Sequence, residues 1–188
     1  MKAKETPPAN IVIFGGKGDL AWRKLIPAFY NLFISGYLPE QFAIYGVHYE
    51  KMEEKKYEAH LLEGINTFSR TGKANKEQWK KFAARVFFFE GDFTAEDTFR
   101  RLSGTLSAND KEWKSRAVRL FYYSVSPRFI EPISLFLAKF ELANDTGSDR
   151  IVIEKPFGSD LHTAKELNQL LTKHFKEKQI YRIDHYLG

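Results

Sequence analysis

The sequence contains no cysteine, so disulfides, thiolate catalysis and cysteine-ligated metal sites are excluded. It also has no apolar run near the roughly 20 residues that a membrane-spanning helix needs. Residues 1–10 lack the hydrophobic stretch of a secretory signal. We therefore expect a soluble, cytoplasmic protein without a membrane partner or a metal. Any redox chemistry would then depend on a bound cofactor.

Charge of one sign is not concentrated in any part of the chain. The formal net charge is +5, but basic and acidic residues are mixed in segments such as 50–58 and 173–178, which is typical of solvated helix faces. This mixing gives little of the one-sided potential that nucleic-acid binding needs. The charge pattern therefore disfavours a nucleic-acid partner, while the positive excess suits a small anionic ligand.

Two kinds of segment alternate along the 188 residues, without an internal repeat or a linker rich in proline and glycine. Short runs of β-branched and aromatic residues predict strands at 10–14, 42–47, 86–89, 117–123, 150–154 and 179–183. Amphipathic stretches predict helices from residue 19 to a stop at 36, in a charged stretch ending near 68, and at 76–84, 95–106, 127–140 and 161–175. This alternation predicts a doubly wound α/β fold with a mostly parallel sheet, in one domain spanning residues 1–188.

Residues 15–20, Gly-Gly-Lys-Gly-Asp-Leu, join the first predicted strand to the first predicted helix. Glycines permit a tight turn, and the backbone amides at a helix start attract a phosphate group. The spacing departs from G-x-G-x-x-G, so the turn by itself also fits an ordinary βα connection in which Asp19 satisfies free amides. A kinase-type P-loop is disfavoured because no Gly-Lys-Ser/Thr follows, and a dinucleotide is the better ligand.

The end of the second predicted strand bears on which dinucleotide would bind. In such folds an acid at this position holds the ribose 2′-hydroxyl of NAD, whereas an arginine accepts the 2′-phosphate of NADP. Here residues 47–51 read Val-His-Tyr-Glu-Lys. The segment offers both an acid and a cation, so the residues alone leave the choice of cofactor open.

Four separated motifs stand out: IFGGKGDLA at 13–21 with RKL at 23–25, FYYSVSP at 121–127, IEKPFG at 153–158 and RIDHYLG at 182–188. Together they resemble the amino-terminal coenzyme domain of the glucose-6-phosphate dehydrogenase family. The last two motifs are highly specific to the family. The resemblance spans essentially the whole chain and is weakest between residues 50 and 115.

The resemblance implies an NADP-dependent enzyme of the pentose phosphate pathway, which oxidises D-glucose 6-phosphate to the 6-phosphoglucono-lactone. It also implies a homo-oligomeric parent protein whose small-molecule partners are glucose 6-phosphate and NADP, with NAD as the alternative cofactor. The coenzyme-binding residues that the resemblance implies are Gly15, Gly16, Lys17, Gly18, Asp19, Leu20, Lys24, Tyr49 and Lys155.

By the same resemblance, Lys155 is a catalytic residue that contacts both substrate and coenzyme. It follows a predicted central strand, and open α/β sheets bind ligands at the carboxyl ends of their strands. His185 and Tyr186 are implied to bind the phosphate of the sugar. Asp184 is implied to be a catalytic residue that hydrogen-bonds the base histidine and holds it in the tautomer that accepts the hydroxyl proton.

One departure from the family pattern concerns the cofactor. Tyr49 stands where the family usually has an arginine for the 2′-phosphate. Without that guanidinium, Lys51, Arg23 or Lys24 would have to replace it, while Glu50 would favour NAD.

The second departure concerns the extent of the chain, which stops at Gly188. We expect the carboxyl-terminal β+α substrate domain, with the base histidine, to be absent, and the chain alone to be inactive. Two alternatives stay open. One is a natural short protein that binds nucleotide or dehydrogenase subunits without catalysis, and the other is a dehydrogenase with another sugar-phosphate substrate or an NAD preference.

Overall fold

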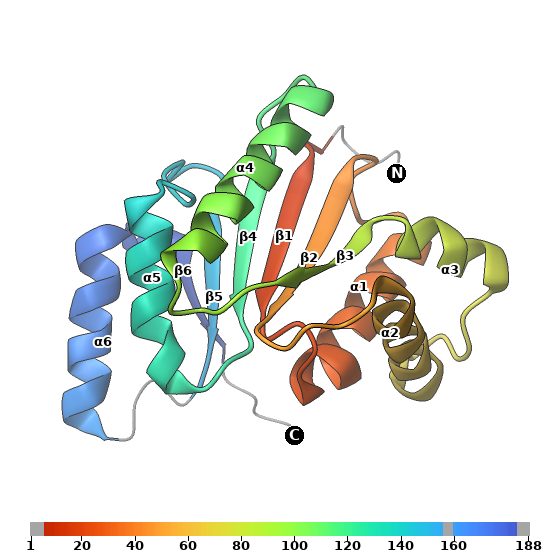
Figure 1. The fold of residues 1–188 in the computed structure, drawn as a ribbon, viewed down its shortest axis with the longest axis horizontal. Helices are drawn as coiled ribbons and strands as arrows, with labels where there is room; N and C mark the ends of the chain where they lie inside the picture. Colours follow the sequence, from red (N-terminus) through yellow and green to blue (C-terminus); the bar gives the residue numbers. More distant parts are fainter. Residues whose placement is uncertain (1–5, 156–159, 184–188) are drawn as a thin grey trace.

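The protein is described here by a computed structural model that covers residues 6–155 and 160–183 and places a parallel sheet between two layers of helices (Figure 1). The strands are β1 Ala9–Phe14, β2 Phe42–His48, β3 Val86–Glu90, β4 Val118–Tyr123, β5 Arg150–Glu154 and β6 Ile180–Ile183. The helices are α1 Ile26–Ile34, α2 Glu54–Phe68, α3 Lys76–Ala83, α4 Glu96–Glu112, α5 Ile130–Lys139 and α6 Leu161–His174. Three short helical segments complete the described part: a π-helical segment Ala21–Leu25 and 3₁₀ turns at Pro127–Phe129 and Glu177–Gln179.

The six strands form one sheet in the order β3-β2-β1-β4-β5-β6, and every neighbouring pair is parallel. From β1 the chain first builds outward through β2 and β3, then returns to the centre and builds the other half from β4 to β6. The doubly wound α/β fold predicted from the alternation of strands and helices is confirmed. The order also makes β1 and β4 neighbours, with their connections leaving in opposite directions.

The two sides of the sheet bury separate hydrophobic cores, because successive side chains of a strand point to opposite faces. Val12 and Phe14 of β1 pack with residues of α4, α5 and α6. Ile11 and Ile13 pack with residues of α1, α2 and α3. All six residues of β1 are buried. The almost wholly apolar sequence of β1 therefore belongs to a strand covered on both faces, as predicted.

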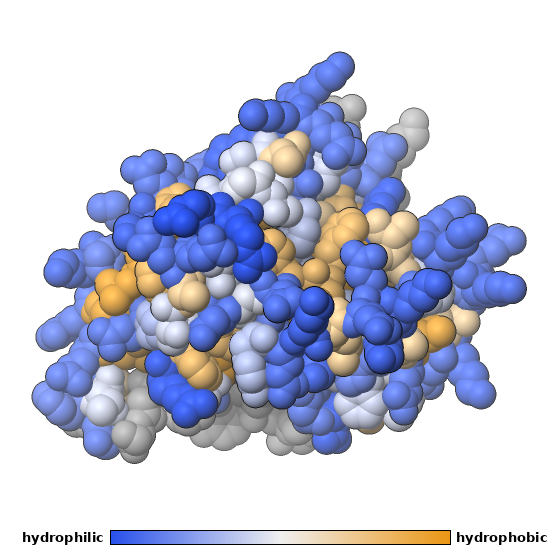
Figure 2. Space-filling view, viewed as in Figure 1, coloured by the Kyte–Doolittle hydropathy of each residue, from blue (hydrophilic) through white to orange (hydrophobic). Residues whose placement is uncertain are grey.

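The edge strand β3 is less well covered than the centre of the sheet. Phe87 keeps 40% of its surface exposed and stacks on Tyr45 of β2, with ring centroids 5.4 Å apart. Figure 2 shows hydrophobic surface over β2 and β3 in this part of the molecule. The strand nevertheless continues the parallel ladder through its pairing with β2.

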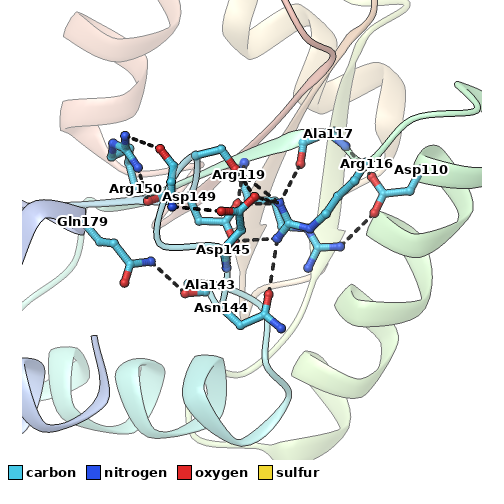
Figure 3. A network of polar contacts seen from close by, with 12 residues as sticks. Asp110, Arg116, Ala117, Arg119, Ala143, Asn144, Asp145, Asp149, Arg150 and Gln179 are labelled. Atoms are coloured by element: carbon cyan, nitrogen blue, oxygen red, sulfur yellow. Dashed lines mark hydrogen bonds and ion pairs between the residues drawn. The ribbon is translucent and has the colours of Figure 1, made fainter. Parts of the chain in front are cut away.

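A network of charged side chains ties β4, β5 and α4 together at the amino ends of the strands (Figure 3). The carboxylate of Asp149 is fully buried and accepts hydrogen bonds from the Arg116 guanidinium at 3.1 and 2.6 Å. Arg119 of β4 donates to Asp110 of α4 at 2.9 Å. The network lies at the amino ends of the strands. A ligand is expected at the opposite, carboxyl ends.

The helices differ from the sequence predictions mainly at their ends. The charged stretch before residue 68 becomes helical only at Glu54, and α4 continues to Glu112 instead of ending near 106. The extra turns of α4 pack on the sheet through Asn109, whose amide donates to Asn10 at 2.6 Å and to the Tyr45 hydroxyl at 2.7 Å. Within the described part of the chain, none of the helices has the length and apolar character needed to cross a membrane.

Candidate functional site

The candidate site lies at the carboxyl ends of β1 and β4, the two central strands. Since their connections leave toward opposite faces of the sheet, this is the position at which open α/β sheets bind ligands. A hollow of about 250 Å³ opens here. Its lining comes from the glycine turn and from the ends of β4 and β5, through Gly18, Asp19, Leu20, Ser124, Val125, Ser126 and Glu154.

The glycine turn fits so closely against its neighbours that two of its positions cannot carry a side chain. Gly15 has a φ of +87°, and a Cβ built on it would overlap the carbonyl oxygen of Ser124. A Cβ on Gly16 would overlap the backbone of Gly46 in β2. The turn therefore brings its backbone into direct contact with β2 and with the segment after β4, and this contact shapes the wall of the hollow.

Backbone hydrogen bonds fix the turn in this position. The amides of Gly15 and Gly16 donate to the Val47 carbonyl at 2.9 and 3.1 Å, and the Gly18 amide donates to the Gly15 carbonyl at 2.8 Å. These three amides are therefore committed to the turn itself. The first turn of the following helix leaves its amides without an intrahelical partner, and those of Asp19 and Leu20 belong to residues that line the hollow.

Gly46 and Tyr57 support the turn, although the sequence analysis gave neither residue a role. Tyr57 of α2 is buried, and its hydroxyl donates to the Gly16 carbonyl at 3.2 Å. A Cβ on Gly46 would overlap that hydroxyl. Burial raises the pKa of Tyr57, so the hydroxyl stays protonated as a donor. The sequence signal that could have identified this contact is Gly46 itself, because a glycine inside a strand often marks the close approach of another group.

The end of β2 carries a cluster of charged and aromatic side chains, which we call the β2-end cluster: Lys17, His48, Tyr49 and Glu50. Lys17 of the glycine turn forms an ion pair with Glu50, whose other carboxylate oxygen accepts from the Tyr49 hydroxyl at 3.3 Å. The Glu50 amide donates to Nδ1 of His48 at 3.2 Å. The His48 and Tyr49 rings stack with centroids 4.7 Å apart.

The other cations considered as substitutes for an arginine, Arg23, Lys24 and Lys51, are all exposed. Arg23 is 3.7 Å from the Asp19 carboxylate, and its guanidinium lies 5.3 Å from the centre of the Phe68 ring in α2. Lys24 is exposed on the π-helical segment, and Lys51 is exposed after β2. The Asp19 carboxylate contacts Arg23, and no side-chain hydrogen bond caps the start of the π-helical segment.

The end of β5 places Glu154 and Lys155 on the opposite side of the hollow from the β2-end cluster. The Tyr122 hydroxyl of β4 donates to Glu154; burial, together with the negative charge of Glu154, raises the pKa of Tyr122. The exposed Lys155 follows directly, and its amide donates to the Ile183 carbonyl of β6 at 3.3 Å. Predicted site residues Asp184, His185 and Tyr186 lie outside the described residues, as do residues 156–158 of the IEKPFG motif.

Comparison with known proteins finds one family over nearly the whole chain. Residues 12–188 match the family model described as glucose-6-phosphate dehydrogenase, NAD binding domain. The chain is 35% identical over 187 residues to a glucose-6-phosphate 1-dehydrogenase of Chlamydia muridarum, covering 97% of this chain and 37% of the relative. It is 36% identical over 188 residues to that of Bacillus subtilis, covering 100% of this chain and 37% of the relative.

Solved structures agree with the sequence comparison. A glucose-6-phosphate dehydrogenase in complex with its substrate glucose-6-phosphate superimposes with a TM-score of 0.86 and 28% identity, over 99% of this chain and 38% of that one. The Mycobacterium avium glucose-6-phosphate 1-dehydrogenase gives a TM-score of 0.81 at 28% identity, over 95% of this chain and 37% of that one. The chain thus spans little more than a third of the length of these relatives.

Proposed function

Because the chain belongs to the glucose-6-phosphate dehydrogenase family, as its amino-terminal NAD(P)-binding domain, we propose that it binds NADP or NAD in the hollow between β1 and β4. The observation that carries this proposal is the glycine turn, whose backbone packs against Gly46 and Ser124 where side chains would not fit. The fit supports a pyrophosphate beside the first helical turn, where free amides and the helix dipole favour negative charge.

Each part of the site has a separate task in this proposal. Gly15, Gly16 and Gly18 shape the turn, and the amides of Asp19 and Leu20 receive the pyrophosphate. Tyr122 orients Glu154, which supports the position of Lys155 next to it in the chain. The ammonium of Lys155 is a flexible donor that reaches both a sugar hydroxyl and the coenzyme. When bound, the nicotinamide ring would supply the hydride acceptor for oxidation of the sugar.

The substrate part of the site follows from the family alone. We propose that the whole protein oxidises glucose 6-phosphate, the substrate that one solved relative binds, to 6-phosphoglucono-lactone. In this scheme His185 and Tyr186 hold the sugar phosphate, and Asp184 orients a base histidine from the part of the relatives that the 188-residue chain does not match. The chain by itself would then bind coenzyme without turning over substrate.

Calorimetric titration of the 188-residue chain with NADP and NAD tests the binding step. We expect saturable binding of at least one of the two coenzymes, with the protein folded throughout as judged by circular dichroism. Failure of a folded chain to bind either coenzyme would contradict the proposal.

A spectrophotometric assay tests the catalytic step. The chain with glucose 6-phosphate and NADP should produce no NADPH absorbance, whereas the same residues within a protein of the relatives' full length should produce it. Steady turnover by the purified 188-residue chain would show that the division of the active site proposed here is wrong.

A further inference from the structure

The β2-end cluster lies where doubly wound folds distinguish NAD from NADP. In such folds an acid at the end of the second strand binds the 2′-hydroxyl of the adenosine ribose, and a cation binds the 2′-phosphate. This chain has both kinds of group, and the structure pairs them with each other, since Lys17 contacts Glu50. A ligand that uses either group therefore has to compete with the other.

Contacts on three sides keep Glu50 in place. Lys17 and the Tyr49 hydroxyl bind its carboxylate, and its amide donates to His48. The hydrogen bond and the positive charge of Lys17 lower the pKa of Glu50, so the carboxylate is charged at neutral pH. Glu50 therefore carries a negative charge at the end of β2.

The ion pair itself is open to solvent and can be exchanged. The Lys17 side chain is 27% exposed and that of Glu50 is 49% exposed. Exposed pairs of this kind hold together weakly, so a phosphate group can take over the ammonium. Lys17 also directly precedes Gly18, Asp19 and Leu20, the residues of the glycine turn that line the hollow.

We propose that Lys17 and Glu50 act together as the coenzyme-selecting pair of this chain. Glu50 accepts the ribose 2′-hydroxyl of NAD, and Lys17, once released from Glu50, binds the 2′-phosphate of NADP. The inference rests on the proposed coenzyme function. Because the 2′-phosphate reaches Lys17 only beside the Glu50 carboxylate, repulsion between the two anions weakens NADP binding, and the chain accepts both coenzymes.

Two substitutions separate the roles of the pair in calorimetric titrations. Glu50→Gln removes the competing negative charge, so NADP should bind about tenfold more tightly and NAD about threefold more weakly, as expected for one close charge or hydrogen bond. Lys17→Gln should weaken NADP binding at least about tenfold, while NAD should bind at least as tightly as before because Glu50 no longer has a competing partner. Lys17→Arg keeps the cation and should retain most of the NADP affinity.

Neighbouring residues of the same charge provide matched controls. Glu53→Gln and Lys55→Gln make the same changes in net charge a few residues away, and each should shift both coenzymes together by less than about twofold. Equal shifts in the control variants would overturn the proposal, because they would reflect overall charge alone. An NADP-to-NAD affinity ratio that stays the same in Glu50→Gln would overturn it as well.

The same titrations distinguish this inference from the proposed function. If the unsubstituted chain binds neither coenzyme, both are wrong. If it binds a coenzyme but substitutions at positions 17 and 50 leave the NADP-to-NAD affinity ratio unchanged, the proposed function stands and the inference about the selecting pair is wrong.

Discussion

Gly16 is one of two residues of the glycine turn at which a side chain would overlap neighbouring backbone. A Cβ there would meet the backbone of Gly46, which cannot rotate away as a side chain can. We expect Gly16→Ala to destabilise the fold by about 2 kcal/mol, the usual scale of overpacking, and to weaken coenzyme binding at least about tenfold. Chemical denaturation and calorimetric titration measure the two effects.

Gly104 provides the matched glycine control. It lies inside α4, and a Cβ on it would have no neighbour within 4 Å. Gly104→Ala should stabilise the protein by up to about 1 kcal/mol through helix propensity, with unchanged coenzyme affinity. Equal behaviour of the two alanine variants would mean that the contact between Gly16 and Gly46 does not constrain the turn.

His48 reports on the β2-end cluster through its titration. Burial and the positive charge of Lys17 lower the pKa of His48 from the ordinary value of 6.5, while Glu50 acts in the opposite direction. The folded state therefore favours the neutral ring. The stability that this contributes is complete above the unfolded-state pKa and is lost as the pH falls through the lower folded-state pKa.

An NMR titration of the His48 ring protons measures this effect. The midpoint should lie below 6.5, rise in Lys17→Gln and fall further in Glu50→Gln. Lys51→Gln should move the midpoint less than Lys17→Gln does. If the His48 midpoint is the same in Lys17→Gln as in the unsubstituted chain, the Lys17 ammonium does not lie beside the ring in solution.

At the scale of elements, the start of α3 is held by the side chain of the residue that precedes it. Asn75 precedes the helix, and its side chain accepts hydrogen bonds from the amides of Glu77 and Gln78 at 2.9 and 3.2 Å. Asn75→Ala should cost about 1 kcal/mol of stability, as the loss of an N-cap usually does. Asn75→Asp, which keeps the acceptor, should restore it. Equal denaturation midpoints for the alanine and aspartate variants would contradict the capping role.

The strands were the elements that the sequence predicted best. Their apolar runs are short and bounded, and each predicted range overlaps an observed strand to within about two residues at either end. The order of the strands was not contained in any local pattern, because pairing between β1 and β4 joins residues more than a hundred positions apart. The alternation of strands and helices indicated a doubly wound sheet, but the pairing of its strands is determined by tertiary packing.

Helix ends were predicted less well, for reasons visible in single residues. The last turns of α4 are polar, so hydrophobic periodicity stopped at Leu106, yet Asn109 anchors those turns on Asn10 and Tyr45. A π-helical segment interrupts the first predicted helix, and its side chains show no distinct pattern. Trp22 in this segment stacks on His60 of α2 with the rings 10° from parallel, a contact set by tertiary structure.

The candidate site was predicted in part. The glycine turn and the ends of β2 and β5 were identified from motifs, but the ion pair between Lys17 and Glu50 spans 33 positions and has no sequence signal. Lys51, Arg23 and Lys24 were the cations expected to compensate for the missing arginine. The structure also brings Lys17 from the turn to the end of β2.

On the scale of the whole molecule, the amino ends and the carboxyl ends of the strands carry different groups of residues. The charged network around Asp149 holds β4, β5 and α4 together at the amino ends of the strands, far from the hollow at their carboxyl ends. Asp149→Asn would present a donor amide to the Arg116 guanidinium and to the amides of Arg119 and Asp145, which now donate to the carboxylate. We expect a loss of about 2 kcal/mol of stability with unchanged coenzyme affinity.

Thermal denaturation combined with NADP titration checks this separation of tasks. Arg100→Gln, which removes an exposed ion pair with Glu96 on α4, is the matched control and should leave the denaturation midpoint almost unchanged. If Asp149→Asn weakened coenzyme binding as strongly as it lowers stability, the two ends of the strands would have to be treated as one cooperative unit.

The interlocked contacts of Gly16, Gly46 and Tyr57 also bear on how related sequences can diverge. Each of the three blocks a change in another, since a Cβ on Gly16 would overlap the Gly46 α-carbon and a Cβ on Gly46 would overlap the Tyr57 hydroxyl. We expect these positions to vary only together among homologues. Lys17 and Glu50 are partly exposed and free of that constraint. If the two residues select the coenzyme as proposed, single substitutions can change coenzyme preference between lineages without disturbing the contacts that support the glycine turn.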